Sequence, residues 1–341
     1  MHVLVIGGTQ FMGPHVVRGL EAAGNDVTLL HRGQHEPDRG TTRHIHGDRA
    51  DPMVVERAIG EASPEVVVDM VAMAERDADA LVAAASGRVR RLVLASSIDV
   101  YRAYGRLHGT EPGPPDPTPL TEDSPLREKR YPYRADAPRD AADPERWRDE
   151  YDKIPVEQAI LSAPGIEGVV LRLPMVYGPG DRQRRLYPYL KRMLDNRPAI
   201  PIGETLARWR TSRGYVENVA DAIVLAARAP SSVGRVYNVA EENNETERDW
   251  IAAVGQAAGW RGKVSLLPDG SLREMLSPAE AVHHIYASSS RIRRELGYRE
   301  RIDRDEALPR TVAWESSNSP AGWPSSVFDY HAEDRALGQR R

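Results

Sequence analysis

The chain has 341 residues, 28% of them charged and 40% hydrophobic, and a formal net charge of −4. That length allows one large α/β unit, a smaller lobe and a substantial buried core. The sequence contains no cysteine, which excludes disulfides, thiolate metal sites and a cysteine nucleophile, so any redox chemistry would need a bound cofactor.

Charge and hydropathy also limit the partners that we expect. Acidic and basic residues are interspersed, so no basic region indicates nucleic-acid binding. The N-terminus runs directly into an apolar strand without the features of a secretion signal, and no segment approaches the ~20 apolar residues that cross a bilayer. We therefore expect a cytoplasmic protein, without a membrane segment, that acts on a small molecule.

The first hundred residues alternate short β-rich runs with helical patterns. Strands are expected at 2–6, 26–31, 43–47, 65–71 and 91–96, and helices at 13–23, 51–60 and 75–86. Apolar runs of this length with intervening helices predict a parallel sheet covered on both faces. This is the doubly wound α/β pattern of the Rossmann fold.

Residues 102–150 interrupt the alternation with a proline-rich stretch and then an Arg/Asp/Glu-rich one. So many prolines argue against regular helix or central strand. A long irregular segment in a compact enzyme is usually a lid, a binding loop or an oligomer contact. A disordered surface insert is the alternative.

Regular structure resumes beyond this insertion. Helices are expected at 154–162, 183–195, 217–228, 246–258 and 288–298, and strands at 168–174, 199–203, 211–216 and 235–240. We expect a Rossmann domain over 1–175 and a smaller, mainly substrate-binding lobe over 176–341, with 211–240 returning to the Rossmann domain. The tail from about Ser316 is expected to be loosely ordered.

The stretch VLVIGGTQFMG places Gly7, Gly8 and Gly13 between the first strand and the first helix. Glycine permits a tight turn and a close backbone approach, and the helix N-terminus can then face a pyrophosphate. Gln10 stands where a second motif glycine often sits. This context predicts a dinucleotide site.

The second strand ends in His31 and Arg32 rather than in the acidic residue that would accept the ribose hydroxyls of NAD. Arginine suits a 2′-phosphate, so NADP is favoured as the cofactor and NAD stays open. After the third strand, Asp48 could accept a hydrogen bond from the adenine amino group, whereas Asp51 before Pro52 is typical of a helix cap.

Together with motifs downstream, these features resemble the extended short-chain dehydrogenase/reductase superfamily, the NAD(P)-dependent epimerase/dehydratase group. The resemblance covers residues 1 to about 300, through GGTQFMG, GDRAD, LASSIDVY, YDKIPVE, RLPMVYGPGD, TSRGYVENVADA and VYNVA. It implies an epimerase, dehydratase or reductase that acts on a hydroxyl or carbonyl group, with a sugar or nucleotide sugar as substrate. The implied cofactor contacts are Gly7, Thr9, Gln10, Phe11, Met12, Gly13, Arg32, Asp48, Ala72, Lys153 and Pro174.

The resemblance also assigns catalytic and substrate residues. Ser97 would hydrogen-bond the reacting oxygen, and Asp99 matches a position that is acidic in dehydratase-type members, although it also suits a turn cap. Tyr101 and Tyr177 would lie near the substrate. Arg213 matches an arginine that binds a nucleotide-sugar diphosphate, with a plain surface arginine as the alternative.

Family members carry a catalytic Tyr-x-x-x-Lys, whose two side chains share one helix face. Lys153, one of only four lysines, matches the lysine, but Asp149 stands four positions before it. Tyr151 is two positions before it, about 200° round a helix and so on the other side. Because Pro155 suits a first helical turn, residues 149–153 are expected to be irregular, which would let Tyr151 reach the site.

Three outcomes stay open at this point. Tyr151 serves as the acid/base; or another residue does, such as Tyr101, Tyr104, Tyr131, Tyr133 or Asp149; or redox chemistry is lost and the nucleotide is structural. Some members of the superfamily act as regulators or RNA-binding proteins, so a non-catalytic protein is the alternative function. A homodimer through the 154–163 helix is expected by analogy alone.

His44 and His46 alternate on one strand, so they share a face that could hold a metal ion. The sequence shows no third ligand. An ordinary polar strand face is therefore preferred, and no metal is expected.

Overall fold

The computed structural model of the protein describes residues 1–35, 42–135, 137–320, 323 and 325–338. At its centre is a seven-stranded sheet built from β1 (His2–Ile6), β2 (Asp26–His31), β3 (Arg43–His46), β4 (Val66–Asp69), β5 (Arg91–Ser97), β6 (Glu167–Leu173) and β10 (Arg235–Asn238). All neighbouring strands are parallel, in the order β10-β6-β5-β4-β1-β2-β3. From β1 the sheet extends in one direction through β2 and β3, and in the other direction through β4, β5, β6 and β10. Ligands of such sheets bind where the strand order reverses, between β1 and β4, beyond the carboxyl ends of the strands.

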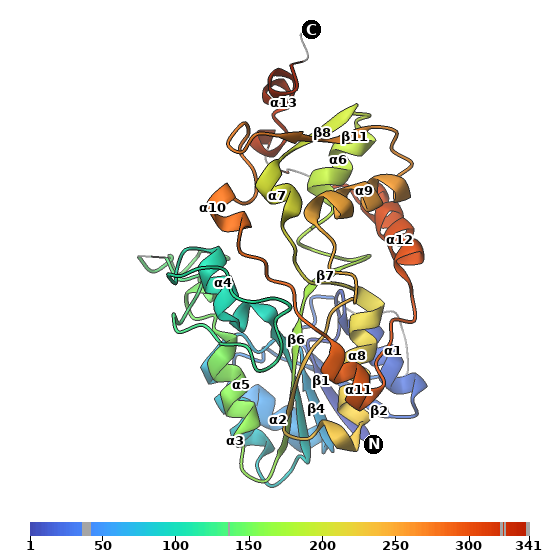
Figure 1. Ribbon diagram of the computed structural model, residues 1–341. Coiled ribbons are helices and arrows are strands. Elements are labelled where there is room, and N and C mark those ends of the chain that lie inside the picture. Colours follow the sequence, from blue (N-terminus) through green and yellow to red (C-terminus); the bar gives the residue numbers. More distant parts are fainter. Residues whose placement is uncertain (36–41, 136, 321–322, 324, 339–341) are drawn as a thin grey trace.

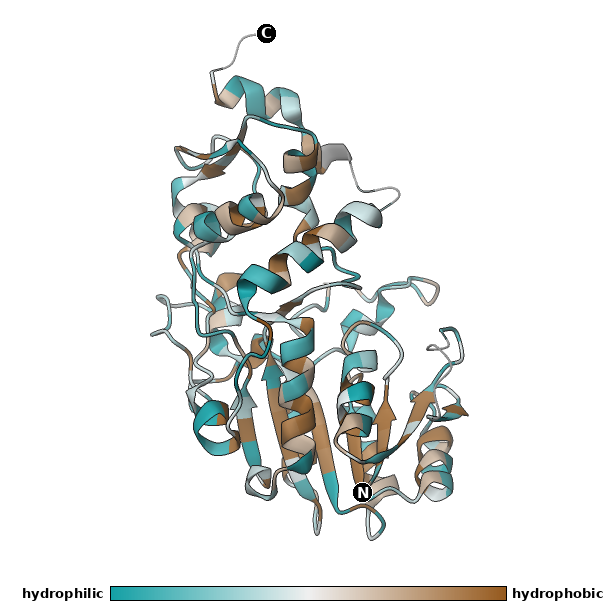
Figure 2. Cartoon of the chain, turned by 90° about the vertical axis from the view of Figure 1, so that its right-hand side faces the viewer, coloured by the Kyte–Doolittle hydropathy of each residue, from teal (hydrophilic) through white to brown (hydrophobic). Residues whose placement is uncertain are grey.

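Helices cover both faces of the sheet (Figure 1). One face carries α1 (Gly13–Ala22) and α8 (Val216–Arg228), and the other carries α2 (Pro52–Ala62), α3 (Glu75–Ala85) and α5 (Lys153–Leu161). Alternate residues of one strand serve the two layers: Val3 and Val5 belong to one buried cluster, Leu4 and Ile6 to the other. The hydrophobic strands between helices with hydrophilic outer faces are visible in Figure 2.

A second lobe lies beyond the carboxyl ends of the strands (Figure 1). It contains α6 (Tyr187–Leu194), β8 (Ala199–Gly203), α7 (Glu204–Arg208), α9 (Glu247–Ala257), β11 (Lys263–Leu267), α10 (Pro278–Ala281), α12 (Arg304–Ser317) and α13 (Tyr330–Ala336). β8 pairs with β11, and the short strands β7 (Met175–Tyr177) and β9 (Arg213–Tyr215) pair where the chain passes between the two parts. The chain returns to the sheet with α11 (Ser290–Leu296).

Two expectations about irregular segments were wrong in part. Residues 102–150 contain a helix, α4 (Arg102–Leu107), and a 3-10 turn, η2 (Arg146–Asp149). The prolines begin only at Pro112, so nothing prevents a helix before them. The tail is also more regular than expected, because Glu333 of α13 is buried in an ion pair with Arg192 of α6, an attachment that hydropathy does not reveal.

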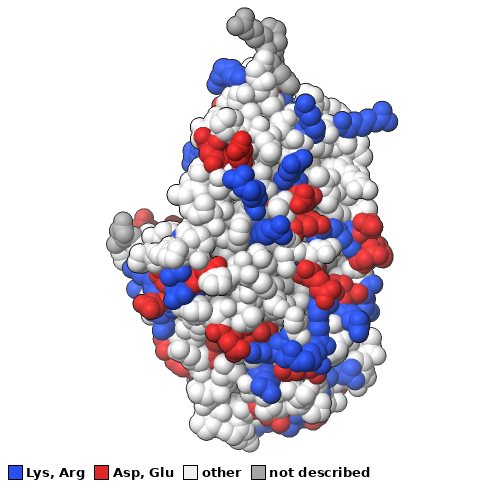
Figure 3. All heavy atoms as spheres, viewed as in Figure 1, with Lys and Arg blue, Asp and Glu red and all other residues white. Residues whose placement is uncertain are grey.

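On the face drawn in Figure 3, blue and red side chains lie next to one another over both parts of the protein. This agrees with the interspersed charges of the sequence. In the part of the chain that the structure describes, no helix has both the length and the apolar character that a membrane crossing requires.

Candidate functional site

Three glycines shape the turn between β1 and α1. A Cβ on Gly7 would lie 2.5 Å from Val71 Cγ1, and one on Gly13 would lie 2.4 Å from the backbone carbonyl carbon of Gly8. Gly7 also has a φ of 89°, which glycine adopts at little cost. Met12, at the N-cap of α1, makes no side-chain cap, but Gly13 N–H donates to the Gln10 carbonyl at 2.9 Å, His15 N–H donates to the Met12 carbonyl at 3.1 Å, and Pro14 has no N–H. The positive end of the helix dipole therefore favours an anion here.

The other expected cofactor contacts lie along the same edge of the sheet. Thr9, Gln10, Phe11 and Met12 are half-buried in the turn, and Arg32 and Asp48 are exposed after β2 and β3. The Asp48 carboxylate accepts a hydrogen bond from the Ala50 N–H at 2.9 Å, as in a turn. Pro174 directly follows β6. A close-packed glycine turn, an uncapped helix start and an exposed arginine together fit the pyrophosphate and ribose of a dinucleotide.

Ala72 stands after β4 in a loop that Asp69 holds. One oxygen of Asp69 accepts hydrogen bonds from the Val71 and Ala72 N–H groups, each at 2.9 Å. The Ala72 carbonyl then accepts a hydrogen bond of 2.5 Å from Lys153 Nζ, which also donates to the Ala95 carbonyl at 3.0 Å. Lys153 is 4% exposed and therefore joins the ends of β4 and β5 from the start of α5.

The backbone before Lys153 explains how a tyrosine two positions away reaches the same site. α5 begins only at Lys153, and Asp152 has extended dihedrals (φ −160°, ψ 113°) and caps the helix by accepting from Ile154 N. The buried Asp152 carboxylate is held by Arg127 at 3.2 Å and Arg130 at 2.6 Å. Tyr151 thus lies outside the helix, so the helical angle of 200° does not apply to it.

Tyr151 donates its hydroxyl proton to Asp99 Oδ2 at 2.8 Å. Asp99 lies in a short 3-10 turn, η1 (Ile98–Val100), directly after Ser97, whose Oγ accepts from the Asp99 N–H at 3.2 Å. Tyr133 donates to the same Asp99 oxygen at 3.1 Å, and its hydroxyl lies 2.8 Å from that of Tyr104. The segment 102–150 therefore supplies two tyrosines to the network, which the sequence named only as alternatives.

Burial sets the proton affinities of this network. It raises the pKa of Asp99, although the hydrogen bond from Tyr151 and the charge of Arg127 oppose the shift. Burial and the charge of Asp99 hold the pKa of Tyr151 well above its usual value. Burial lowers the pKa of Lys153, opposed by the charges of Asp69 and Asp99. A carboxyl group with a raised pKa next to a hydroxyl can exchange a proton with it.

Three other residues that the sequence suggested for the acid/base role, Tyr101, Tyr131 and Asp149, are held in other contacts. Tyr101 is fully buried; its hydroxyl donates to Asn238 at 2.7 Å and accepts from Arg172 at 3.0 Å, and burial raises its pKa to about 12. Its surroundings therefore favour a structural role over substrate contact. Asp149 pairs with Arg139, and Tyr131 lies under the guanidinium of Arg134, 3.7 Å from the ring centroid.

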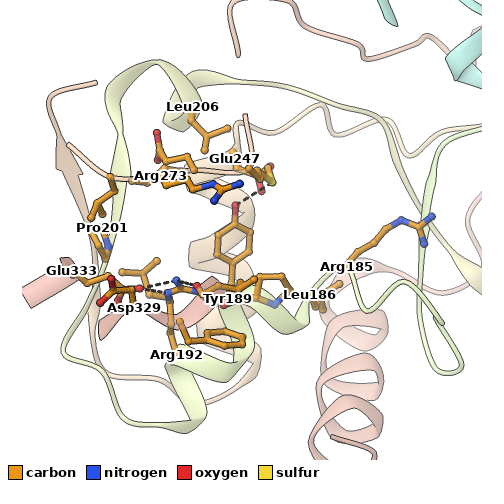
Figure 4. Close-up of a pocket in the computed structure, with 18 of the residues that line it drawn as sticks. Arg185, Leu186, Tyr189, Arg192, Pro201, Leu206, Glu247, Arg273, Asp329 and Glu333 are labelled. Carbon is orange, nitrogen blue, oxygen red and sulfur yellow. Dashed lines mark hydrogen bonds and ion pairs between the residues drawn. The ribbon is translucent and has the colours of Figure 1, made fainter. Parts of the chain in front are cut away.

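A cavity of about 1180 Å³ lies in the second lobe (Figure 4). Its walls come from β7, α6, β8, α9 and the segment Val327–Glu333, and they include Tyr177 and Arg213. Tyr151 and Asp99 are not among the described residues that line it. However, β7 begins directly after Pro174, so this strand leads from the edge of the sheet into the cavity wall.

The structure places a third histidine against His44 and His46. His31, at the end of β2, pairs with His46 of β3, and its Nε2 lies 2.9 Å from His44 Nδ1. His31 could not be recognised as a third ligand from the sequence, because it lies 13 positions before His44 and meets the other two histidines only through strand pairing.

Comparisons with known proteins bear on this geometry. Residues 3–240 match the model of the NAD dependent epimerase/dehydratase family. A 3-diazoavenalumate denitrifying reductase of a Streptomyces species is 26% identical over 267 residues, which are 76% of this chain and 82% of the relative. A 2′-dehydrokanamycin reductase of Streptomyces kanamyceticus is 28% identical over 221 residues, 61% of this chain and 53% of that protein.

Solved structures share the fold. The UDP-glucose 4-epimerase of Thermotoga maritima with UDP-glucose superimposes with a TM-score of 0.69 at 18% identity, covering 94% of this chain and 100% of that one. The UDP-glucose 4-epimerase of Thermus thermophilus with NAD gives a TM-score of 0.67 at 22% identity, covering 92% and 98%.

Proposed function

The chain belongs to the NAD-dependent epimerase/dehydratase family, and from this membership we propose that it is an NAD(P)-dependent enzyme of the epimerase, dehydratase or reductase type. It would act on a hydroxyl or carbonyl carbon of a small molecule by hydride transfer. The observation that carries the proposal is the buried hydrogen bond of 2.8 Å from Tyr151 to Asp99. A family fold without such an acid/base pair would support nucleotide binding alone.

When bound, the nicotinamide supplies the hydride acceptor or donor; the residues of the chain handle the proton. In the oxidising direction, the substrate hydroxyl gives its proton to Tyr151 Oη while Tyr151 passes its own proton to Asp99 Oδ2. Reduction reverses both transfers. The tyrosine stays neutral throughout, which suits its raised pKa, and Asp99 takes up the charge change.

Lys153 would act on the cofactor side of this site. Two protons of its ammonium group are directed to the Ala72 and Ala95 carbonyls, and an ammonium group has three. The third would orient the nicotinamide ribose, the role that the family resemblance implies. Ser97, directly before η1, would hydrogen-bond the reacting oxygen of the substrate.

We favour NADP over NAD because Arg32 is exposed at the end of β2. Replacing Arg32 by alanine is expected to raise the KM for NADPH about 10- to 100-fold and to leave that for NADH nearly unchanged, since hydrogen bonds to charged groups contribute ~1.5–3 kcal/mol. Steady-state kinetics with both cofactors check this. Arg88→Ala, before β5, is the control. Equal effects on NADPH and NADH would remove Arg32 from cofactor selection.

Support for the substrate class comes from the relatives and structural neighbours rather than from the geometry of the site. Relatives reduce a diazo acid and a dehydrokanamycin by name, and structural neighbours hold UDP-glucose, so sugars and related small carbonyl compounds are the first class to test. A homodimer through α5 and a cytoplasmic location complete the proposal. Light scattering of the purified chain tests the dimer.

One experiment tests the enzyme proposal. Binding of NADPH and NADH is measured by calorimetry up to about 1 mM, the upper range of ordinary KM values. Transfer of deuterium from (4-²H)NADPH to a panel of sugars, ketones and aldehydes is then followed by mass spectrometry. Binding with transfer supports the proposal, and lack of binding refutes it. Binding without transfer to any compound favours the non-catalytic regulator or RNA-binding alternative.

A further inference from the structure

We propose that the cavity in the second lobe takes an electrically neutral substrate with an apolar or aromatic face, and not a nucleotide sugar. This inference rests on the proposed function, because it names the substrate class of that enzyme. It starts from the arginines of the cavity, which would be the natural partners of a diphosphate.

Arg213 is already paired inside the protein. Its guanidinium bonds to Glu247 of α9, and their side chains are 6% and 3% exposed. The same guanidinium lies 4.4 Å from the ring centroid of Trp250. A carboxylate and an aromatic ring therefore occupy the surfaces that a diphosphate would need.

Arg192 of α6 is paired in the same way. Its nitrogens donate to Glu333 Oε1 at 2.6 and 2.8 Å, and the Glu333 side chain is 5% exposed. The second oxygen of Glu333 lies 3.9 Å from Arg197. Figure 4 shows Arg192 and Glu333 next to each other in the cavity wall.

The charges of the cavity balance. Four of the described residues that line it are arginines and four are acidic; those not yet named are Arg185, Arg273, Glu274 and Asp329. A nucleotide sugar adds two negative charges. To pair with Arg213 or Arg192, its diphosphate would have to separate that arginine from Glu247 or Glu333, which leaves a buried carboxylate without its cation beside the incoming phosphate.

The rest of the lining suits a neutral ligand. Aliphatic and aromatic side chains dominate it, among them Leu186, Ile200, Ile202, Leu206, Trp250 and Phe328. Such walls bind apolar and aromatic groups, and a few polar groups fix their orientation.

Calorimetry with the full chain tests the inference, using UDP-glucose and the neutral p-nitrophenyl glucoside as probes. We expect saturable binding of the glucoside and none of UDP-glucose at about 1 mM. Binding of UDP-glucose by the wild type, or no binding of the glucoside, would overturn the inference.

A double variant, Glu247→Gln with Glu333→Gln, removes both carboxylate charges and keeps their shape. It is expected to gain at least about tenfold in affinity for UDP-glucose. An unchanged affinity would also count against the inference. NADPH binding is measured in every sample, because its loss would refute the proposed enzyme rather than this substrate class.

A different observation carries a second inference, which is independent of the reaction: we infer that His31, His44 and His46 form a site for a divalent transition-metal ion such as Zn²⁺. The site lies at the carboxyl ends of β2 and β3, at the edge of the sheet. One ligand atom from each histidine lies within 4.8 Å of the other two.

The local hydrogen bonds define the state of these rings. Gly33 N–H donates to His31 Nδ1 at 3.2 Å, so the neutral ring carries its proton on Nε2, which lies 2.9 Å from His44 Nδ1. Binding of an ion through His31 Nε2 therefore requires the ring proton to move to Nδ1 and the contact with Gly33 to break. The three imidazoles then supply three of the four ligands that Zn²⁺ takes.

Titration of untagged, EDTA-dialysed protein with ZnCl₂ and CoCl₂ tests the site. We expect one ion per chain and a visible Co²⁺ absorption band. His44→Gln and His46→Gln should each lower the affinity at least about tenfold, while the exposed His108→Gln should not. Absence of saturable binding, or unchanged affinity in both variants, would overturn the inference.

Discussion

Tyr151 and Asp99, 52 positions apart in the chain, meet in a buried hydrogen bond of 2.8 Å between the start of α5 and the end of β5. Lys153, two positions after Tyr151, donates to the Ala95 carbonyl of β5 at 3.0 Å. In the proposed function, proton transfer and cofactor orientation therefore belong to neighbouring residues of one short segment.

Removing the Tyr151 hydroxyl should abolish proton transfer and leave the cofactor site intact. For Tyr151→Phe we expect turnover to fall ~10²- to 10⁴-fold, the usual contribution of a general acid/base, with unchanged affinity for NADPH. Stopped assays and calorimetry measure the two quantities. Tyr237→Phe is the matched control, because Tyr237 bonds to Glu295 instead. Full activity of Tyr151→Phe would transfer the role to another residue, with Tyr133 the first to test.

The substitution Asp99→Asn should affect the stability of the protein and its turnover in different ways. The raised pKa of Asp99 means that the folded state binds this proton more tightly than the unfolded chain does. Its contribution to stability is therefore present at low pH and lost as pH rises through the raised folded pKa. Asparagine does not ionise and therefore avoids that loss of stability. The Tm of Asp99→Asn minus the Tm of the wild type should therefore be larger at about pH 8 than at about pH 4.

The same variant should have little turnover at any pH, because Tyr151 then has no acceptor for its proton. In the wild type, oxidation should lose activity towards acid pH at a higher pH than an ordinary aspartate would impose. A rate profile of Asp99→Asn that matches the wild type would contradict the relay.

Lys153→Met keeps a long apolar stem but loses the ammonium group. We expect weaker binding of NADPH and loss of turnover, because the two carbonyl contacts and the ribose donor disappear together. Calorimetry and initial rates provide the measurements. Lys191→Met, which breaks a pair with Asp195 on α6, serves as the control. Unchanged turnover would remove Lys153 from the mechanism.

Two glycines should respond to alanine in opposite directions. In Gly13→Ala the new Cβ would lie 2.4 Å from the Gly8 backbone, so the turn must distort; we expect a lower Tm and weaker NADPH binding. In Gly60→Ala the Cβ meets nothing within 4 Å on the exposed side of α2, and stability should rise by ~0.5–1 kcal/mol. Thermal unfolding of both checks this. If Gly13→Ala is as stable as wild type, close packing does not explain that glycine.

The fold was predictable because its signals are local. Strands such as His2–Ile6 and Asp26–His31 are short apolar runs, and the glycines mark the turn after the first of them. The bounds of most helices differed from expectation by a few residues. Five helices of the described residues were missed: α4, α7, α10, α12 and α13. α4, α7 and α10 are too short to show an apolar period, α12 has Pro309 in its interior, and α13 is a charged helix held by ion pairs.

The sequence alone determined the parallel sheet and the glycine turn, because residue type and spacing within an element carry that information. Its resemblance to the family implied Ser97, Asp99, Tyr151 and Lys153 as candidates. Only the tertiary structure decided which of them meet. Asp152, held by Arg127 and Arg130, keeps Tyr151 out of the helix; α13 brings Glu333 to Arg192; and strand pairing brings His31 to His46. These contacts join distant segments, and their partners are selected by packing and charge balance rather than by any local pattern.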